Sequence, residues 1–445
     1  MFYRILPDDG SQNKLYAAED VFNKYCRGYG YPVNVRAGVL KKDVEIMPAA
    51  DLRHDEVKIS RNVLEFLSIP SDISYYVRWE ENEICFGPVI GLLLAQSNRH
   101  FTPKRMEKFL EYGLRYEEIH GLLYVFSLEG IDFDRRCIEG FYYTPDEDGL
   151  KPKWKHGVFP FADSVFRRVC LPTAILNKIK DITENRIFNS YFFNKWEFWN
   201  KCSGNASVKD NIPATRIFKS FEDIDEMLEL YGSVYLKPIN GTLGNGLIRI
   251  QKKENCYYLQ GKFDENPVMA TTREEAKAYV GRIRSGYLYI VQQDIKLLKY
   301  VDRFVDFRVI MQKDYTRKWN CTGIVACAGA PKGIHSNYIN DTIYMSFEDV
   351  MTKALSLDKT AAFKKRQDVI ELCKKVCRAF DDKGENFGDF GIDVGFDEAL
   401  KPWVFELNKS QFYFVPQMIG DYYAYYAART NPVKYAAALS GFGAE

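Results

Sequence analysis

The sequence has no apolar run long enough to cross a bilayer, because its longest one, Gly87 to Ala95, falls far short of about 20 residues. The N-terminal residues reach Asp8 and Asp9 before a signal-peptide core could form, so we expect no secretion signal. The 61 Lys and Arg against 60 Asp and Glu leave a net charge of +1, without the basic excess of a general nucleic-acid binder. We therefore expect a cytoplasmic protein with no membrane partner and no nucleic-acid partner.

Cysteine and histidine offer little chemistry. The ten cysteines include no C-x-x-C pair and follow no regular spacing, so we expect reduced thiols. The five histidines are scattered along the chain, which gives no Ser-His-Asp or Cys-His pattern. What the sequence does have is length and aromatic residues. Its 445 residues predict about three structural units, and its 31 Phe and 30 Tyr suit a large core.

Strand-like and helix-like segments divide the chain into three parts. We expect a small β-rich module over 1–80, an α/β domain over 81–185 and a larger body over 186–445. In the last body strands outnumber helices and several are hairpin-spaced, so its fold class is α+β rather than doubly wound. The predicted strands are 233–237, 247–251, 288–293, 304–312, 320–328, 390–395 and 403–408. The predicted helices are 221–230, 272–283, 361–380 and one near the C-terminus.

A lysine and a glycine-rich loop stand together after residue 233. Strand alternation places Val234 and Leu236 on one face and Lys237 on the other, at the strand end. Glycines let a backbone approach a ligand closely and aim its N–H groups at phosphate oxygens, and a neighbouring lysine adds a point charge. A hairpin with a solvated lysine stays open as the alternative. The loop consists of Gly241, Thr242, Leu243, Gly244, Asn245 and Gly246.

Two acidic strands follow near the C-terminus. In the first, Asp393 is flanked by two glycines that should leave open space above it. In the second, alternation places Trp403, Phe405 and Leu407 in the core and Glu406 with Asn408 on the other face. A hairpin would bring these two carboxylates and one amide together, and such oxygen donors suit Mg²⁺ shared with phosphates. An amphipathic hairpin with a wet outer face is the alternative.

Two further polar positions interrupt apolar strands. Arg308 lies in the middle of an apolar strand, where an unpaired guanidinium would be costly, so it needs an anion. That anion is either Asp306, on its own face, or the phosphate or carboxylate of a ligand. The segment from Gln292 through Gln293 and Asp294 to Ile295 ends another strand, and its backbone could serve a purine base.

Taken together, these motifs resemble the ATP-grasp superfamily. The 13-residue step from Asp393 to Glu406, followed by Glu-x-Asn, is similar to the metal-binding pattern of D-alanine–D-alanine ligases and ribosomal-protein glutamate ligases. Upstream segments such as Phe86 to Gly91 and Asn194 to Trp196 sharpen the likeness. Together with Phe159-Pro160, 165–168, 213–215 and 236–238, they resemble the YheC/YheD-type, endospore coat-associated ATP-grasp proteins, over most of the chain from about 80 to 430.

The resemblance implies an ATP-grasp fold with ATP between two α+β subdomains. The subdomains would be 186–290, with the lysine and the Gly-rich loop, and 291–445, with the metal ligands; 81–185 would be a pre-ATP-grasp domain. It further implies that Asp393, Glu406 and Asn408 hold Mg²⁺, and that Arg308 meets the γ-phosphate or an acyl phosphate. The remaining implied positions are Lys195 and Lys237 on ATP, Gly241, Thr242, Gly244, Asn245 and Gly246 over the phosphates, Gln292, Gln293, Asp294 and Ile295 at adenine, and Asn337 near the substrate.

The activity implied is that of an ADP-forming carboxylate–amine ligase, which phosphorylates a carboxylate and then transfers it to an amine or a peptide. A kinase of a small molecule or protein, and a spore-coat assembly protein without turnover, stay open. A homo-oligomeric state and a spore-associated location also stay open. The chain departs from the pattern at Asn340-Asp341, where paired glycines are usual, and at Lys409, Ser410 and Gln411, where a proline often follows. Both departures fall on the acceptor side of the site.

Overall fold

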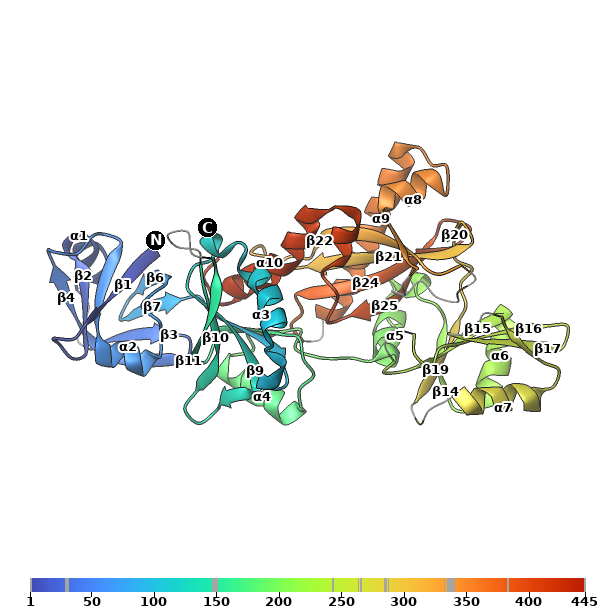
Figure 1. Cartoon of the computed structure of the whole chain (residues 1–445), viewed down its shortest axis with the longest axis horizontal. Coiled ribbons are helices and arrows are strands. Elements are labelled where there is room, and N and C mark those ends of the chain that lie inside the picture. The colour runs from blue at the N-terminus through green and yellow to red at the C-terminus, as the bar shows by residue number, and fades with distance from the viewer. Residues whose placement is uncertain are drawn as a thin grey trace.

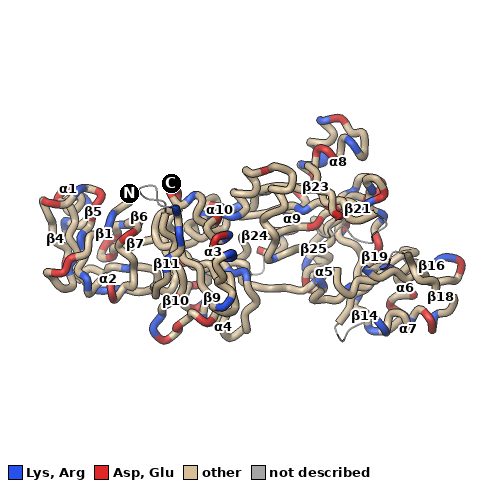
Figure 2. The backbone as a smooth tube through the Cα atoms, in the orientation of Figure 1, with Lys and Arg blue, Asp and Glu red and all other residues tan. Residues whose placement is uncertain are grey.

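The computed structural model arranges the chain as an elongated molecule with a β-barrel at one end and a small sheet at the other (Figure 1). The structure describes every residue except 1, 29–31, 146–150, 242, 243, 263, 265, 284, 285, 287, 332, 334–340, 382, 383, 444 and 445. Acidic and basic residues are scattered over all parts of the backbone, in keeping with the near-neutral charge (Figure 2). Among the described residues, no helix is both long enough and apolar enough to traverse a membrane.

The N-terminal part is a closed barrel with strand order β1-β5-β2-β4-β3-β7-β6. Its strands are β1 (Phe2–Asp8), β2 (Lys14–Ala18), β3 (Val33–Ala37), β4 (Leu40–Ala49), β5 (Glu56–Ser60), β6 (Ser74–Glu80) and β7 (Glu83–Gly87). Helix α2 (Arg61–Leu67) ends just ahead of Ile69-Pro70, as expected for a segment that precedes a proline. The barrel interior is filled by alternate apolar residues such as Val33, Val35 and Val57.

The second sheet begins directly after the barrel and has the order β11-β10-β9-β8-β12-β13. Its strands are β8 (Val89–Ala95), β9 (Leu122–Asp132), β10 (Cys137–Thr144), β11 (Lys153–Pro160), β12 (Ser164–Arg167) and β13 (Ile187–Phe188). Strand β8 pairs in parallel with β9 and β12. Strand β7 therefore closes the barrel, and β8 starts the next sheet. Helices α3 (Pro103–Phe109) and α4 (Thr173–Ile182) belong to this region.

Two antiparallel sheets form the rest of the chain, so the α+β class is confirmed. The third sheet contains β14 (Thr215–Phe218), β15 (Ser233–Pro238), β16 (Ile248–Lys253), β17 (Cys256–Gly261), β18 (Val268–Ala270) and β19 (Tyr289–Gln293). The fourth contains β20 (Lys299–Tyr300), β21 (Arg303–Gln312), β22 (Asn320–Ala328), β23 (Ile343–Ser346), β24 (Asp389–Phe396) and β25 (Pro402–Asn408). The main helices are α5 (Lys195–Ser203), α6 (Phe221–Tyr231), α7 (Arg273–Ile283), α8 (Phe347–Lys353), α9 (Lys359–Asp381) and α10 (Tyr422–Leu439).

The C-terminal helix α10 holds the middle of the molecule together. It packs against β8 and β12 of the second sheet and against β21 and β22 of the fourth. Its residues Tyr435 and Ala436 share one apolar cluster with Phe166 and Phe188. Beyond it the chain returns to the barrel, where Arg78 donates to the Gly441 carbonyl at 2.9 Å, and Figure 1 shows both termini on that side. The second and fourth sheets are thus joined through a common core.

Candidate nucleotide site

A pocket lies between the third and fourth sheets and encloses about 1100 Å³ of space, part of it open to solvent. Its floor comes from β15 and β19 on one side and from β21, β24 and β25 on the other. Among the residues predicted from the sequence, the pocket is lined by Lys195, Lys237, Gly241, Gly244, Asn245, Gln292, Gln293, Asp294, Ile295, Asp393 and Glu406. Residues from five separated segments therefore meet in one place.

The two predicted carboxylates are direct neighbours across strands β24 and β25. Asp393 is the register partner of Glu406, and Gly391 is the partner of Asn408. The Asn408 side chain donates from Nδ2 to Asp393 Oδ2 at 3.1 Å. The three oxygen-bearing side chains are therefore gathered as the hairpin reading predicted.

The alternation that we assigned to β25 is wrong in its first half. Val404 and Leu407 are in the core, whereas Phe405 lines the pocket beside Glu406. The cause is a β-bulge: Asp393 pairs with Glu406 but Val394 already pairs with Val404, so one residue of β25 has no partner on β24. The bulge turns an aromatic ring toward the site, and alternation alone could not reveal it.

Asp393 lines the pocket, but the space directly over the two glycines beside it is filled by side chains. A Cβ on Gly391 would come within 2.9 Å of the Gln411 side chain, and one on Gly395 within 2.6 Å of Leu297 and 2.9 Å of Phe405. Glycine is required there because neighbouring side chains pack directly on the strand backbone. The glycines therefore shape the walls beside the carboxylate, and the space next to Asp393 is the pocket itself.

Each carboxylate has its own cation. Arg308 is the register partner of Asp393 and donates to it from Nε at 2.6 Å and from Nη2 at 3.3 Å. Lys195 Nζ lies 2.9 Å from Glu406 Oε1 and donates to the Gly241 carbonyl at 2.7 Å. Asp393, which we had not considered as its partner, is thus an anion that Arg308 meets. The site carries alternating charge even without a nucleotide.

Local sequence explains why Lys195 reaches the pocket. It is the first residue of α5, whose N-terminus is closed by a capping box between Asn194 and Glu197. The Asn194 side chain accepts from the Glu197 N–H at 2.9 Å, and the Glu197 side chain accepts from the Asn194 N–H at 2.8 Å. This reciprocal pair fixes the start of the helix and hence the direction of the lysine.

Burial and neighbouring charges shift the pKa values of the site. Burial raises the pKa of Asp393 despite the Arg308 guanidinium beside it. Burial is the largest effect on Glu406 and opposes its ionisation, but Lys195, Lys237 and Arg308 together outweigh burial, and the pKa of Glu406 is lowered. Burial, together with the charge of Lys195, lowers the pKa of Lys237 to about 8. An added anion would therefore favour the charged form of Lys237.

Lys237 and the strand end next to it form the opposite wall. Val234 and Leu236 are fully buried, as predicted, and Lys237 Nζ donates to Gln292 Oε1 at 2.7 Å. Asp294 accepts from Arg249 at 2.7 Å and from the Ser233 hydroxyl at 2.7 Å, so its carboxylate is tied to the third sheet. Ile295 follows at the pocket wall, and among the described residues no hydrogen bond engages its backbone N–H.

The glycine-rich loop needs its glycines. Gly244 and Gly246 have φ of +69° and +73°, in the left-handed region that other residues rarely adopt. A Cβ on Gly246 would also lie 2.9 Å from the Tyr289 hydroxyl. Thr242 of the same loop lies outside the described residues, as does Asn337. Arg308 and Asn408 do not line the pocket but form hydrogen bonds with Asp393, which does. Gly246 does not line it either and supports the loop.

A second cavity adjoins the first, and the sequence reading missed its main cation. Lys195, Gly241 and Glu406 line both cavities, while Asn408, Lys409 and Ser410 line only the second. Burial lowers the pKa of Lys409 to about 8, and its Nζ donates to the Phe193 carbonyl. We had recorded Lys409 only as a departure from the family pattern. Its position directly after Glu-x-Asn was the available signal.

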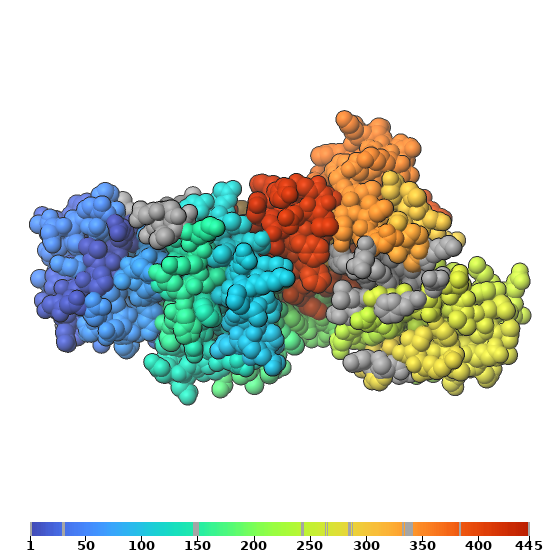
Figure 3. Space-filling view, in the orientation of Figure 1, coloured from blue at the N-terminus to red at the C-terminus, as the bar shows by residue number. Residues whose placement is uncertain are grey.

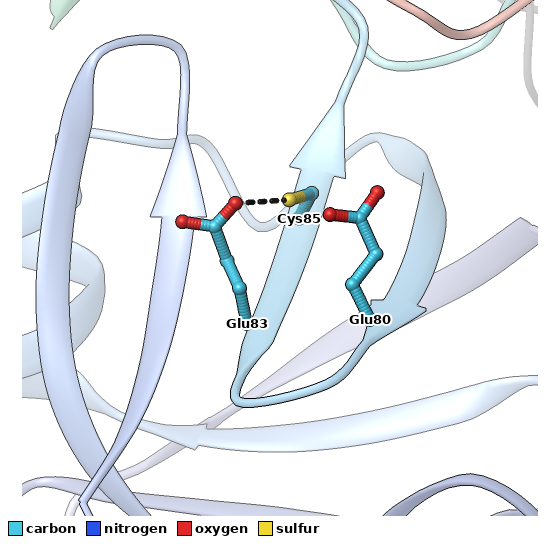
Figure 4. A group of neighbouring side chains, drawn as sticks. All are labelled: Glu80, Glu83 and Cys85. Carbon is cyan, nitrogen blue, oxygen red and sulfur yellow. Dashed lines mark hydrogen bonds between the residues drawn. The ribbon is translucent and has the colours of Figure 1, made fainter.

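A different acidic cluster lies in the barrel and was not predicted. Within the described part of the chain, Glu80, Glu83 and Cys85 are the one group of three His, Cys, Asp or Glu ligand atoms within 4.8 Å of one another (Figure 4). Glu83 is already paired with Lys41 at 2.6 Å and with Arg36 at 3.3 Å. Arg78 lies 3.1 Å from Glu80. The third member of this cluster is a thiol, which is a poor ligand for Mg²⁺, so Asp393, Glu406 and Asn408 are the better set of oxygen donors for this ion.

The third and fourth sheets enclose a pocket with lysines and a carboxylate pair, which is the arrangement expected of an ATP-grasp protein. The chain belongs to the YheC/D-like ATP-grasp family, whose model matches residues 184–439, which is more than half of the chain. The family resemblance inferred from the sequence is therefore confirmed.

Individual proteins resemble the chain to different extents. It is 26% identical over 386 residues to the endospore coat-associated protein YheD of Bacillus subtilis (strain 168), across 80% of each chain. It is 20% identical over 217 residues to the endospore coat-associated protein YheC of the same organism, across 48% of this chain and 58% of that protein. The solved VanG D-Ala:D-Ser ligase from Enterococcus faecalis matches 80% of this chain and 98% of its own, at 10% identity and a TM-score of 0.44.

Proposed function

We propose that the chain is a Mg²⁺-dependent carboxylate–amine ligase that forms an amide bond through an acyl phosphate and releases ADP. The observation that carries this proposal is that one pocket is lined both by apolar side chains and by a set of cations and carboxylates. The apolar side chains suit a purine base, and they are Leu247, Ile290, Ile295, Leu297 and Phe304. The cations and carboxylates suit a polyphosphate with its metal ion.

The lysines, the glycine-rich loop and Arg308 would hold the phosphates from three directions. Lys237 and Lys195 would each exchange a neutral or acidic protein partner for a phosphate oxygen, and the Gly244 and Gly246 loop would cover them. Arg308, fixed by Asp393, would lie over the transferred phosphoryl group. Charge in such a transfer spreads over the phosphoryl oxygens, so cations held in place stabilise it. Ile295 would offer its backbone N–H to the base.

The oxygen donors Asp393, Glu406 and Asn408 fit Mg²⁺ in type. When bound, Mg²⁺ would offset the negative charge on the phosphates. Bringing ATP beside two bare carboxylates would be unfavourable, and the present ion pairs with Arg308 and Lys195 balance those carboxylates in the nucleotide-free protein. Release of Lys195 from Glu406 would free one cation for phosphate and one carboxylate for the metal.

The reaction proceeds in two balanced steps. A carboxylate oxygen of the substrate attacks the γ-phosphorus, and the bond to the β-phosphate oxygen breaks to release ADP. The amine of the acceptor then attacks the acyl carbon, inorganic phosphate leaves and the amine loses a proton. The second cavity is lined by Asn408, Lys409 and Ser410 and shares Lys195, Gly241 and Glu406 with the first, so it would be the place where the acyl phosphate meets the amine.

Hydroxylamine tests this proposal without the natural amine. Candidate acids are incubated with the protein, Mg²⁺, ATP and hydroxylamine, and hydroxamate, ADP and phosphate are quantified. A ligase gives hydroxamate and ADP in equal amounts with the correct acid, and Glu406→Gln gives neither. A stable phosphate ester without hydroxamate would instead establish a kinase. If no ADP forms with any of the acids although the protein binds ATP, the result would favour an assembly protein without turnover.

A further inference from the structure

A basic groove lies where the second sheet meets the segment that follows β25. Figure 3 shows the region of α3 (cyan) directly beside the C-terminal part of the chain (red). The groove joins the proposed reaction site, because Ser410 lines both it and the cavity that contains Asn408. Its lining residues with charged side chains are Arg105, Lys108, Glu111, Arg168 and Arg429.

The groove carries an excess of positive charge. Arg429 forms an ion pair with Glu111, its one acidic lining residue. Among the described residues, no salt bridge to a carboxylate involves Arg105, Lys108 or Arg168. Arg105 and Lys108 have no acidic partner among the described residues, and Arg168 is offset only in part by the buried Asp389. This excess of positive charge in one groove, in a chain whose net charge is only +1, favours an anionic occupant.

Arg168 is held at the end of the groove nearest the reaction site. Its Nη2 donates to the Gln411 carbonyl at 2.6 Å and its Nη1 to the Tyr112 hydroxyl at 3.0 Å. The guanidinium lies 4.4 Å from the centre of the Tyr413 ring. Neutral hydrogen-bond partners fix its direction, and the buried carboxylate of Asp389 offsets part of its charge. A guanidinium held in this way can still receive a carboxylate in the groove.

Exposed aromatic residues extend the groove on its outer side. Phe412 and Phe414 line the groove and are 48% and 37% exposed. The Tyr425 hydroxyl donates to Glu111 at 2.5 Å, and its ring centre lies 5.1 Å from that of Tyr426. The surface thus continues onto the start of α10. We name Phe412, Phe414, Met418, Tyr422 and Tyr426 the aromatic ledge; all five are more than a third exposed.

We propose that the basic groove and the aromatic ledge bind an acidic peptide segment with aromatic side chains and present one of its carboxylates to the nucleotide site. This inference rests on the proposed ligase function. A small acid would fill the groove alone, whereas an extended chain that advances about 3.3 Å per residue reaches both surfaces. An exposed apolar surface that continues a charged groove marks a binding site for a polypeptide. Few cations and an apolar ledge fit such a peptide better than a nucleic acid.

Fluorescence anisotropy with a labelled peptide of alternating Glu and Tyr, about eight residues long so that it spans both surfaces, tests the inference. The matched probes replace Glu by Lys, replace Tyr by Ala, or use a single-stranded oligonucleotide of equal charge. The variant is the double charge reversal Arg105→Glu with Lys108→Glu. Lys104→Glu is its control, because Lys104 is exposed on the same helix α3 but does not line the groove.

The double reversal should weaken binding of the Glu–Tyr peptide about tenfold, since two attractive charges become repulsive, whereas Lys104→Glu should stay within about twofold. Replacement of Tyr by Ala should also weaken binding. Equal affinity for the Lys peptide, tighter binding of the oligonucleotide, or equal affinity of both variants would overturn the inference. ATP-induced thermal stabilisation is measured in parallel: its absence in the unmodified protein contradicts the nucleotide site, and its presence without peptide binding contradicts only the groove.

Discussion

The start and the middle of strand β24 present carboxylates on the same face, yet the two carboxylates have different surroundings. Asp389 is fully buried and accepts from Gln312 at 2.8 Å, Gln411 at 2.6 Å and the Tyr413 hydroxyl at 2.6 Å. Asp393, four residues on, is paired with Arg308 and lines the pocket. Three neutral donors and the charge of Arg168 hold the first carboxylate in the core, whereas the second, paired with Arg308, faces an open pocket. The partners of an acid, rather than its position on a strand, distinguish a structural group from a site.

The largest effect on turnover should come from a carboxylate that lines the pocket. Glu406→Gln should lower ligase turnover at least about 100-fold, because the side chain lies where the metal and the transferring phosphate need negative charge. Thermal stability without ATP should change little, since the Glu406 side chain is 36% exposed and its pair with Lys195 is therefore partly screened by water. Hydroxamate formation and a melting curve measure the two quantities. Full turnover in Glu406→Gln would remove this residue from the site.

Asp393→Asn sharpens the same contrast. Repulsion between two neighbouring carboxylates would by itself predict that removal of one leaves the metal-free protein as stable as before or stabilises it. The buried pair with Arg308 changes that expectation: the variant should lose turnover and also stability, by about 3–5 kcal/mol, because a guanidinium is left without its anion. Chemical denaturation of the two variants side by side would show the difference.

Substitution of the buried Asp389 should have the opposite effect, a loss of stability without a loss of ATP affinity. Asp389→Asn places an amide N–H₂ among three donors, so one or more buried hydrogen bonds are lost. We expect the melting temperature to fall by several degrees, in line with a cost of about 2–3 kcal/mol, while the affinity for ATP stays unchanged. A variant with normal melting but weak ATP binding would contradict the comparison. Gln411 and Tyr413 also line the basic groove, so peptide binding should suffer with stability.

The pH dependence of ATP binding should be moderate and should depend on Lys237. Its pKa of about 8 means that the free protein holds this charge at pH 7 and loses it by pH 9, so ATP affinity should fall by up to about tenfold over that interval. Lys237→Arg stays charged and should remove most of this fall, whereas Lys237→Ala should weaken binding at both pH values. Lys409 has a pKa of about 8 as well, and Lys409→Arg serves as the matched control.

Stability without ATP should change with pH in the opposite direction. The native pKa of Lys237 is below that of an ordinary lysine, so between about pH 8 and 10.5 the unfolded chain binds more protons and stability rises with pH. Lys195, Glu406, Asp294 and Asp393 act on this pKa, so the effect belongs to the whole site. Titrations that show no proton uptake on ATP binding above pH 8 would contradict it.

The smallest effect is expected in the barrel. Glu83→Gln removes a carboxylate from the cluster with Glu80 and Cys85, but Lys41 and Arg36 already neutralise it. The Mg²⁺ requirement should stay the same and ATP affinity should stay within about twofold, with a loss of stability near 1 kcal/mol. A raised Mg²⁺ requirement would show that this cluster, too, contributes to the site.

Much of the fold could be predicted from local pattern. Seven strands of the last two sheets lie within a few residues of their predicted positions, and the helix predicted over 361–380 is α9. Alternation worked where one face is buried, as at Val234 and Leu236. It failed at Phe405, because a bulge leaves no trace in apolar periodicity. It also could not show that β7 belongs to the barrel and β8 to the next sheet, since both strands are apolar on both faces.

The candidate site was predictable as a set of residues but not as a set of pairs. Spacing brought Asp393, Glu406 and Asn408 together because a hairpin fixes register. The partner of Arg308 comes from another strand 85 residues away, and that pairing depends on sheet order. The role of Lys409 depends on burial by Phe193, which no local pattern encodes.

Isothermal titration calorimetry of ATP binding, with and without Mg²⁺, tests the central claim most directly. The account predicts that Mg²⁺ strongly tightens ATP binding in the unmodified protein and that Glu406→Gln abolishes this enhancement while the affinity for metal-free ATP is unchanged or improved. Asp389→Asn should bind like the unmodified protein. Equal affinity with and without Mg²⁺, or an undiminished Mg²⁺ effect in Glu406→Gln, would contradict the assignment of the pocket.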